Sequence, residues 1–153
     1  PNTPVQVKSG MSMWTSSKHV DKSSLEFCKN LLKSIGKEIY TSNENHLDIA
    51  TAISGSGPAY VFLMIESLSE AGIQLGLKKE ISLELAIQTV FGSGKLALSS
   101  KTSPQELRKN VTSRGGTTEA GIKSMLDNGI DQSIIKGVKA AFEKSIELGI
   151  RKN

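Results

Sequence analysis

Two short stretches rich in serine, threonine and glycine contain the residue types best suited to bind a small anion. They are residues 51–57 and 112–118. Each precedes a helical pattern and is predicted to open a helix, where free N–H groups and about half a positive charge favour a carboxylate or phosphate. Helix capping explains either stretch about as well as ligand binding does. Because Gly115 and Gly116 permit close backbone approach, and Arg114 adds a positive charge, the second stretch is favoured as the ligand site.

Other chemistry-bearing residues are few. His19 and His46 are the only histidines and have no neighbouring cysteine, Asp-x-Asp or Glu-x-x-His pattern, so we expect surface histidines and no metal site. Cys28 falls on the apolar side of a helical pattern, which predicts a buried thiol instead of a nucleophile.

Two glycine pairs resemble parts of a dinucleotide-binding loop. Gly55 and Gly57 form one pair, Gly92 and Gly94 the other, and neither has the third glycine of the G-x-G-x-x-G pattern. We therefore expect no tight nucleotide binding by this chain alone. Gly92 and Gly94 lie inside a helical pattern, which indicates close packing between helices.

Residues 1–42 have the pattern of the end of an α/β sheet. Alternation around Gly10 predicts two short strands, at residues 5–7 and 11–13. Asp21 is expected to cap a helix that Gly36 ends, and residues 37–41 form another strand. These elements are too few to close a core, and the chain opens on a turn motif without an initiator methionine. We expect a piece of a longer protein, in which residues 1–42 form the C-terminal end of a larger domain.

Residues 43–153 are predicted to be entirely helical. Helices are expected at about 44–53, 58–76, 81–98, 104–111, 119–127 and from 131 onward. Ser103 and Glu106 form a capping box with Pro104 at the first helical position. The stretch from Ala59 to Ile65 is apolar on all sides, so other helices or a second copy of the chain must cover it.

Composition narrows the class of protein. The 153 residues carry a net charge of +4 that is spread along the chain and not interleaved with aromatic residues, so nucleic acid is not an expected partner. No apolar run approaches the roughly 18 residues of a membrane span, which predicts no membrane association. A single cysteine is typical of a reducing compartment, and we expect a cytoplasmic protein.

Three segments resemble the Δ1-pyrroline-5-carboxylate reductase family. They are DIATAISGSGPAY at residues 48–60, EAGIQLGL at 70–77, and Pro104-x-x-Leu-x-x-x-Val-Thr-Ser-x-Gly-Gly-x-Thr-x-x-Gly-Ile at 104–122. The opening Pro1-Asn2-Thr3-Pro4 is similar to a motif near the end of that family's cofactor domain. The resemblance implies the end of a Rossmann domain at 1–42 and, at 43–153, a helical domain that binds substrate and forms a homodimer or higher homo-oligomer.

The resemblance also implies an activity and a site. The longer protein would reduce Δ1-pyrroline-5-carboxylate to L-proline, the last step of proline biosynthesis, by hydride transfer from NADPH or NADH bound mainly upstream of this chain. Thr118 would be the catalytic residue, hydrogen-bonded near the ring nitrogen. The remaining implied site residues are, for the substrate, Ser113, Gly115, Gly116, Thr117 and Thr51, and, bordering the cofactor, Asn2, Thr3, Thr51 and Ser56. The isolated chain would be inactive.

Two alternatives remain at this stage. A related enzyme of the β-hydroxyacid dehydrogenase type would carry a lysine in the helix after the domain junction, and residues 56–65 contain none. A free helical dimerisation module without catalysis would be distinguished by the absence of a G-x-G-x-x-G loop upstream.

Overall fold

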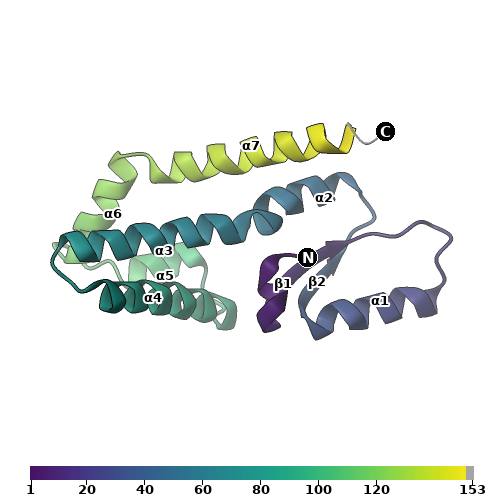
Figure 1. Cartoon of the computed structure of the whole chain (residues 1–153), viewed down its shortest axis with the longest axis horizontal. Helices are drawn as coiled ribbons and strands as arrows, with labels where there is room; N and C mark the ends of the chain where they lie inside the picture. The colour runs from purple at the N-terminus through teal and green to yellow at the C-terminus, as the bar shows by residue number, and fades with distance from the viewer. Residues whose placement is uncertain (151–153) are drawn as a thin grey trace. The chain divides into compact units, whose positions relative to one another are not determined.

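The computed structural model describes residues 1–150, which divide by their contacts into two compact units. The first unit is Pro1–Tyr60 together with the residues from Ile135 onward, and the second is Val61–Ile134. The chain is mainly helical, as the sequence predicts, and has two short strands near its N-terminus (Figure 1).

The first unit contains a parallel strand pair, β1 (Gly10–Trp14) and β2 (Gly36–Tyr40), connected by helix α1 (Lys22–Ser34). The strands are in register from Gly10 opposite Gly36 to Trp14 opposite Tyr40. A side chain at Gly36 would overlap the Gly10 carbonyl, so the start of the pair requires glycine.

One prediction for this region is confirmed and two are wrong. Asp21 caps α1, accepting the Ser24 N–H at 2.9 Å. Residues 3–7 form a 3₁₀ turn (Thr3–Val7) instead of a strand, because Pro4 sits at the first turn and Lys8 ends it in the left-handed region at φ 55°. Cys28 is exposed instead of buried, because two strands are too few to cover the whole apolar side of α1.

One continuous helix runs from Asn45 to Gln74. It consists of α2 (Asn45–Ala50), a π-helical turn (Thr51–Gly55) and α3 (Gly57–Gln74). Its most apolar 18-residue window has a mean hydropathy of 1.2 and is only 6% buried. By length and composition alone it is therefore apolar enough to cross a membrane, and the expectation that no segment qualifies is wrong. The sequence predicted an interrupting loop, whereas the π-helical turn carries the helix through residues 51–55 without a break.

The second unit contains most of α3 together with α4 (Lys79–Ser99), α5 (Pro104–Asn110) and α6 (Thr117–Asp127). Helices α3 and α4 come close together at small residues: the buried Ser82 hydroxyl donates to the Ser69 carbonyl at 2.6 Å, and a side chain at Gly72 would overlap the Ser82 hydroxyl. Among the described residues nothing lies within 4 Å of a side chain built at Gly92 or Gly94, so no helix of this chain packs closely there. The predicted capping box at Ser103 and Glu106 is confirmed.

The chain buries very little apolar surface by itself. The buried apolar side chains among the described residues are Ala52 and Ala86. The large apolar residues in the middle of α3 are exposed: Val61 41%, Phe62 56%, Leu63 62% and Met64 44%. An apolar helix left this open in one chain needs a covering surface from outside it, as the sequence predicts.

The last helix, α7 (Ile130–Ile150), starts in the second unit and belongs to the first from Ile135 onward. In the first unit, the Ser145 hydroxyl donates to the Asp48 carboxylate at 2.6 Å and so links α7 to α2. The residues are 97 positions apart in sequence.

Candidate functional site

The loop between α5 and α6 is shaped by two glycines. Gly115 has φ 72°, in the left-handed region that glycine adopts without cost, and Gly116 is the N-cap of α6. A side chain at Gly116 would come within 2.6 Å of the Ser113 hydroxyl and 3.1 Å of the Ser113 carbonyl. The Gly116 N–H donates to that same carbonyl at 3.0 Å, which closes the loop into a tight turn.

This loop presents free donors to solvent. Helix α6 starts at Thr117, two residues earlier than predicted, and its first intrahelical bond runs from the Ala120 N–H to the Gly116 carbonyl. Within residues 1–150 no hydrogen bond is made by the N–H groups of Thr117, Thr118 or Glu119, nor by the hydroxyls of Ser113, Thr117 and Thr118. Three unpaired N–H groups at a helix N-terminus and three free hydroxyls suit a small ligand that carries a carboxylate.

Glu119 is a residue of this site that the sequence reasoning missed. Its carboxylate accepts the Gly115 N–H at 2.7 Å from the third position of α6. The signal was present in the sequence, since a glutamate three residues after an N-cap regularly reaches back to a preceding N–H. It was missed because the helix was expected to begin at Glu119 itself. The Gly115 N–H is therefore already paired with the Glu119 carboxylate and is not a free donor for a ligand.

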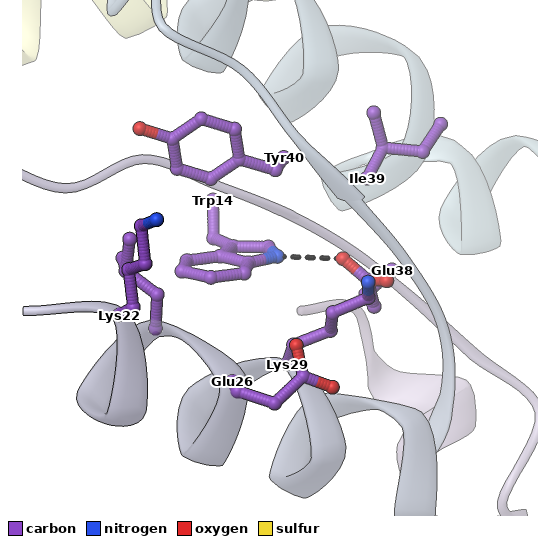
Figure 2. A pocket seen from close by; sticks show the side chains of 8 residues that line it. Trp14, Lys22, Glu26, Lys29, Glu38, Ile39 and Tyr40 are labelled. Atoms are coloured by element: carbon purple, nitrogen blue, oxygen red, sulfur yellow. Dashed lines mark hydrogen bonds between the residues drawn. The ribbon is translucent and has the colours of Figure 1, made fainter.

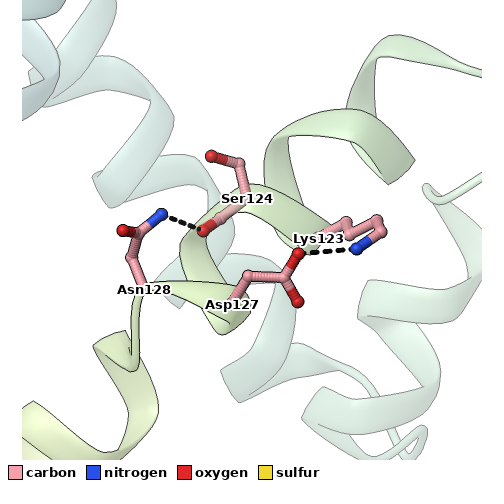
Figure 3. Close-up of polar contacts among 4 residues, drawn as sticks. All are labelled: Lys123, Ser124, Asp127 and Asn128. Atoms are coloured by element: carbon pink, nitrogen blue, oxygen red, sulfur yellow. Dashed lines mark hydrogen bonds and ion pairs between the residues drawn. The ribbon is translucent and has the colours of Figure 1, made fainter.

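A shallow groove of about 500 Å³ extends from the loop along α6. It is lined by Thr112, Gly115, Gly116, Glu119, Ala120, Ile122, Lys123, Leu126 and Asp127. Figure 3 shows its far end, where the Lys123 ammonium pairs with the Asp127 carboxylate at 2.6 Å and Asn128 donates to the Ser124 carbonyl at 2.8 Å. With Lys123 neutralised by Asp127, the free donors of the groove are concentrated at the loop.

The segment 51–57 does not open a helix, so the prediction of a second anion-binding helix N-terminus is wrong. Its hydroxyls bond inside the helix, Thr51 to the Leu47 carbonyl at 2.8 Å and Ser54 to the Ala50 carbonyl at 2.9 Å. The Ser56 N–H reaches back five residues to the Thr51 carbonyl at 2.8 Å, which defines the π-helical turn. Such turns are frequent at functional sites, so Thr51 and Ser56 remain candidates through their position.

The structure brings the candidate residues together in two groups. Ser113, Gly115 and Gly116 lie in the α5–α6 loop of the second unit, and Thr117 and Thr118 form the first turn of α6 directly after it. Asn2, Thr3, Thr51 and Ser56 lie in the first unit, where the Asn2 side chain donates to the Ser54 carbonyl at 3.0 Å.

A second hollow, of about 690 Å³, lies between α1 and the strands (Figure 2). Trp14 lies at its centre, where the indole N–H donates to the Glu38 carboxylate at 2.8 Å. The Trp14 and Tyr40 rings pack edge to face, with their centroids 4.9 Å apart. None of the candidate residues lines this hollow. Both histidines are exposed, as predicted, and within residues 1–150 no three His, Cys, Asp or Glu side chains gather as metal ligands would.

A parallel βαβ unit, followed by helices with an uncovered apolar face and a donor-rich loop, defines a class: a helical association domain preceded by a βαβ unit. The chain belongs to the pyrroline-5-carboxylate reductase dimerisation family, whose model matches residues 44–148. The resemblance seen in the sequence is thereby confirmed.

Named relatives agree with this assignment. A pyrroline-5-carboxylate reductase of Pseudomonas aeruginosa is 40% identical over 148 residues, covering 97% of this chain and 54% of the relative. Among solved structures, the pyrroline carboxylate reductase of Plasmodium falciparum with NADP bound is 40% identical with a TM-score of 0.91, covering 97% of this chain and 61% of that one. A pyrroline-5-carboxylate reductase of Coxiella burnetii is also 40% identical, with a TM-score of 0.92 over 97% of this chain and 55% of that one. The chain spans about half the length of the curated relatives it matches.

Proposed function

We propose that this chain is the dimerising and substrate-binding part of a reductase that converts Δ1-pyrroline-5-carboxylate to L-proline with NAD(P)H. The α5–α6 loop carries the proposal, because it combines three unpaired N–H groups with free hydroxyls in the segment that resembles the family's substrate loop. Residues 1–42 would then be the end of a Rossmann domain and residues 43–153 the helical domain.

The loop has what a small cyclic imino acid requires. The N–H groups at the start of α6 would hold the substrate carboxylate, helped by the partial positive charge of the helix N-terminus. The Thr118 hydroxyl would hydrogen-bond near the ring nitrogen and so orient the C=N bond. Ser113 would complete the contacts on the other side of the turn. Orientation of this kind is the protein's share of a reaction whose hydride comes from a cofactor.

The residues of this chain would form only the border of a dinucleotide site. Within the described chain no G-x-G-x-x-G loop stands between a strand and a helix, so the phosphate-binding loop would lie upstream. Asn2, Thr3, Thr51 and Ser56 would border the nicotinamide end of the cofactor. Bound NAD(P)H would supply the hydride for the imine carbon.

A second copy of the chain is the proposed cover for the apolar face of α3. This homodimer explains the 56% and 62% exposure of Phe62 and Leu63 without a membrane. The family's description as a dimerisation domain supports it.

The test is a Thr118→Ala substitution in the full-length protein that carries this chain. Since the hydroxyl bonds to nothing within residues 1–150, its removal should leave folding unchanged. We expect kcat/KM for the imine to fall about ten- to a hundredfold, the effect of one hydrogen bond worth roughly 1–3 kcal/mol in the transition state. Ser17→Ala, which removes an exposed hydroxyl from the loop before α1, is the control. An unchanged kcat/KM would remove Thr118 from the site.

A further inference from the structure

Asn2 stands at the N-cap of the 3₁₀ turn, yet its side chain makes no capping bond. Asparagine at such a position normally accepts an N–H from the turn it precedes. Here both ends of the amide are used elsewhere: Oδ1 accepts the Met11 N–H at 2.9 Å, and Nδ2 donates to the Ser54 carbonyl at 3.0 Å. The second bond spans 52 residues and joins the α/β part of the first unit to the π-helical turn.

The contact with Met11 fixes Asn2 on one edge of β1. The Asn2 N–H also donates to the Met11 carbonyl at 3.2 Å, so Asn2 takes both backbone groups of that residue. In a parallel pair, alternate residues direct their backbone groups to opposite edges, and Gly10 and Trp14 bond toward β2. The backbone N–H and carbonyl of Met11 therefore face the edge of β1 opposite β2. Asn2 binds both groups at that edge, and these two hydrogen bonds fix its position.

The contact with Ser54 gives a hydrogen-bond donor to a backbone carbonyl that its own helix leaves unpaired. In an α-helix the Ser54 carbonyl would accept the N–H of residue 58, but residue 58 is proline and has none. In a π-helix it would accept the N–H of residue 59, but the Ala59 N–H donates to the Ser56 carbonyl at 3.0 Å. The half-buried Ser54 carbonyl thus has no partner from its own helix, and the Asn2 amide provides one.

We propose that Asn2 is a positioning residue: it holds the π-helical turn at a fixed place against β1 by binding the Ser54 carbonyl that Pro58 leaves unpaired. Thr51 and Ser56 lie at the two ends of this turn. On the proposed function, on which this inference rests, both residues line the meeting point of substrate and nicotinamide. Asn2 then acts on the reaction through the turn and not as a ligand of the cofactor, which is the role that the family resemblance alone implies.

The positioning role predicts a distinct kinetic signature in the full-length protein. Asn2→Ala should lower kcat about ten- to a hundredfold, the usual effect of a displacement near 1 Å at a reacting centre, and should change KM for NAD(P)H by less than about twofold. Asn2→Asp keeps the acceptor for Met11 but loses the donor for Ser54, and should lose as much kcat as Asn2→Ala. Gln6→Ala is the matched control, since this amide is exposed on the same turn and bonds to nothing described.

Pro58→Ala provides the rescue, because it restores an N–H four residues after Ser54. In the Pro58→Ala background, Asn2→Ala should lower kcat by less than about threefold, a coupling that a double-mutant cycle measures directly. An equal loss in both backgrounds would overturn the proposal. So would a raised KM for NAD(P)H with unchanged kcat, since that result would make Asn2 a direct cofactor ligand.

A second experiment tests the Asn2–Ser54 contact without using the reductase reaction. In urea unfolding of the full chain, Asn2→Ala should lower the midpoint, and clearly less so when Pro58→Ala is also present. If wild-type protein shows no reduction of the imine but this coupling is found, the proposed function fails and the Asn2–Ser54 contact stands. Absence of the coupling would overturn the contact whatever the enzyme assay gives.

Discussion

Phe62 in the middle of α3 offers the sharpest test of how the chain completes its core. It is 56% exposed within the chain, and its neighbours Val61, Leu63 and Met64 are 41%, 62% and 44% exposed. The proposed homodimer would cover these side chains with a second copy. Truncation by Phe62→Ala should therefore weaken association while leaving the fold of each chain intact.

The size of the effect follows from the exposed area. A phenylalanine buries roughly 200 Å² when fully covered, so the exposed 56% corresponds to about 110 Å² that a partner can cover. At about 25 cal/mol per Å² this is close to 3 kcal/mol, of which truncation to alanine loses about 2 kcal/mol. A two-fold symmetric dimer contains two copies of Phe62, and both are truncated in the variant. The dimer therefore loses about 4 kcal/mol of association free energy, which raises Kd about a thousandfold.

Sedimentation equilibrium over a dilution series measures this Kd. Phe27→Ala is the matched control, because Phe27 is 69% exposed but lies on α1, outside the proposed helical domain. We expect Phe27→Ala to leave the dimer Kd within about threefold of wild type. An unchanged Kd for Phe62→Ala, or equal weakening by both variants, would refute the reasoning that the α3 face is the association surface.

Two further predictions concern packing and charge. Gly72→Ala should lower the free energy of unfolding by about 1–3 kcal/mol in chemical denaturation, because its methyl group would displace the Ser82 hydroxyl; full stability would show that α3 and α4 do not approach this closely. Hydrogen bonds from the Ser23 hydroxyl and from the Ser24 N–H and hydroxyl hold the pKa of the Asp21 carboxyl well below its ordinary 3.8. Because folding lowers this pKa, the stabilisation that the ionised Asp21 carboxylate provides is fully present above pH 3.8 and is lost as the pH falls further. Asp21→Asn should therefore flatten the decline in Tm between about pH 4 and pH 2. An unaltered decline would contradict this.

Elements fixed by neighbouring residues could be predicted from the sequence. The Asp21 cap acts over three residues and the box of Ser103 and Glu106 over the same distance, so their signals are complete within a few positions. The apolar α3 and its need for a covering surface also followed from periodicity alone. The donor-rich loop at residues 112–118 was found for the same reason, since glycines and hydroxyl residues before a helix describe its geometry locally.

What the sequence did not reveal depends on contacts between distant residues. The Asn2 side chain accepts the Met11 N–H, and it donates to the Ser54 carbonyl in the 51–57 segment, which stays helical. Neither bond has a sequence signal, because each depends on where the fold places a backbone group. Burial was misjudged at Cys28 for a related reason: periodicity shows which side of a helix is apolar, and not whether the chain has enough strands to cover it.

The most direct test of the central claim is the fate of a labelled hydride. The full-length protein that carries this chain is incubated with Δ1-pyrroline-5-carboxylate and NAD(P)H deuterated at the transferable position, and the product is analysed by mass spectrometry. We predict L-proline with one deuterium at the former imine carbon, formed at a rate that Thr118→Ala reduces about ten- to a hundredfold. Cofactor oxidation without labelled proline, or no imine-dependent oxidation at all, would contradict the assignment of this chain to a proline-forming reductase.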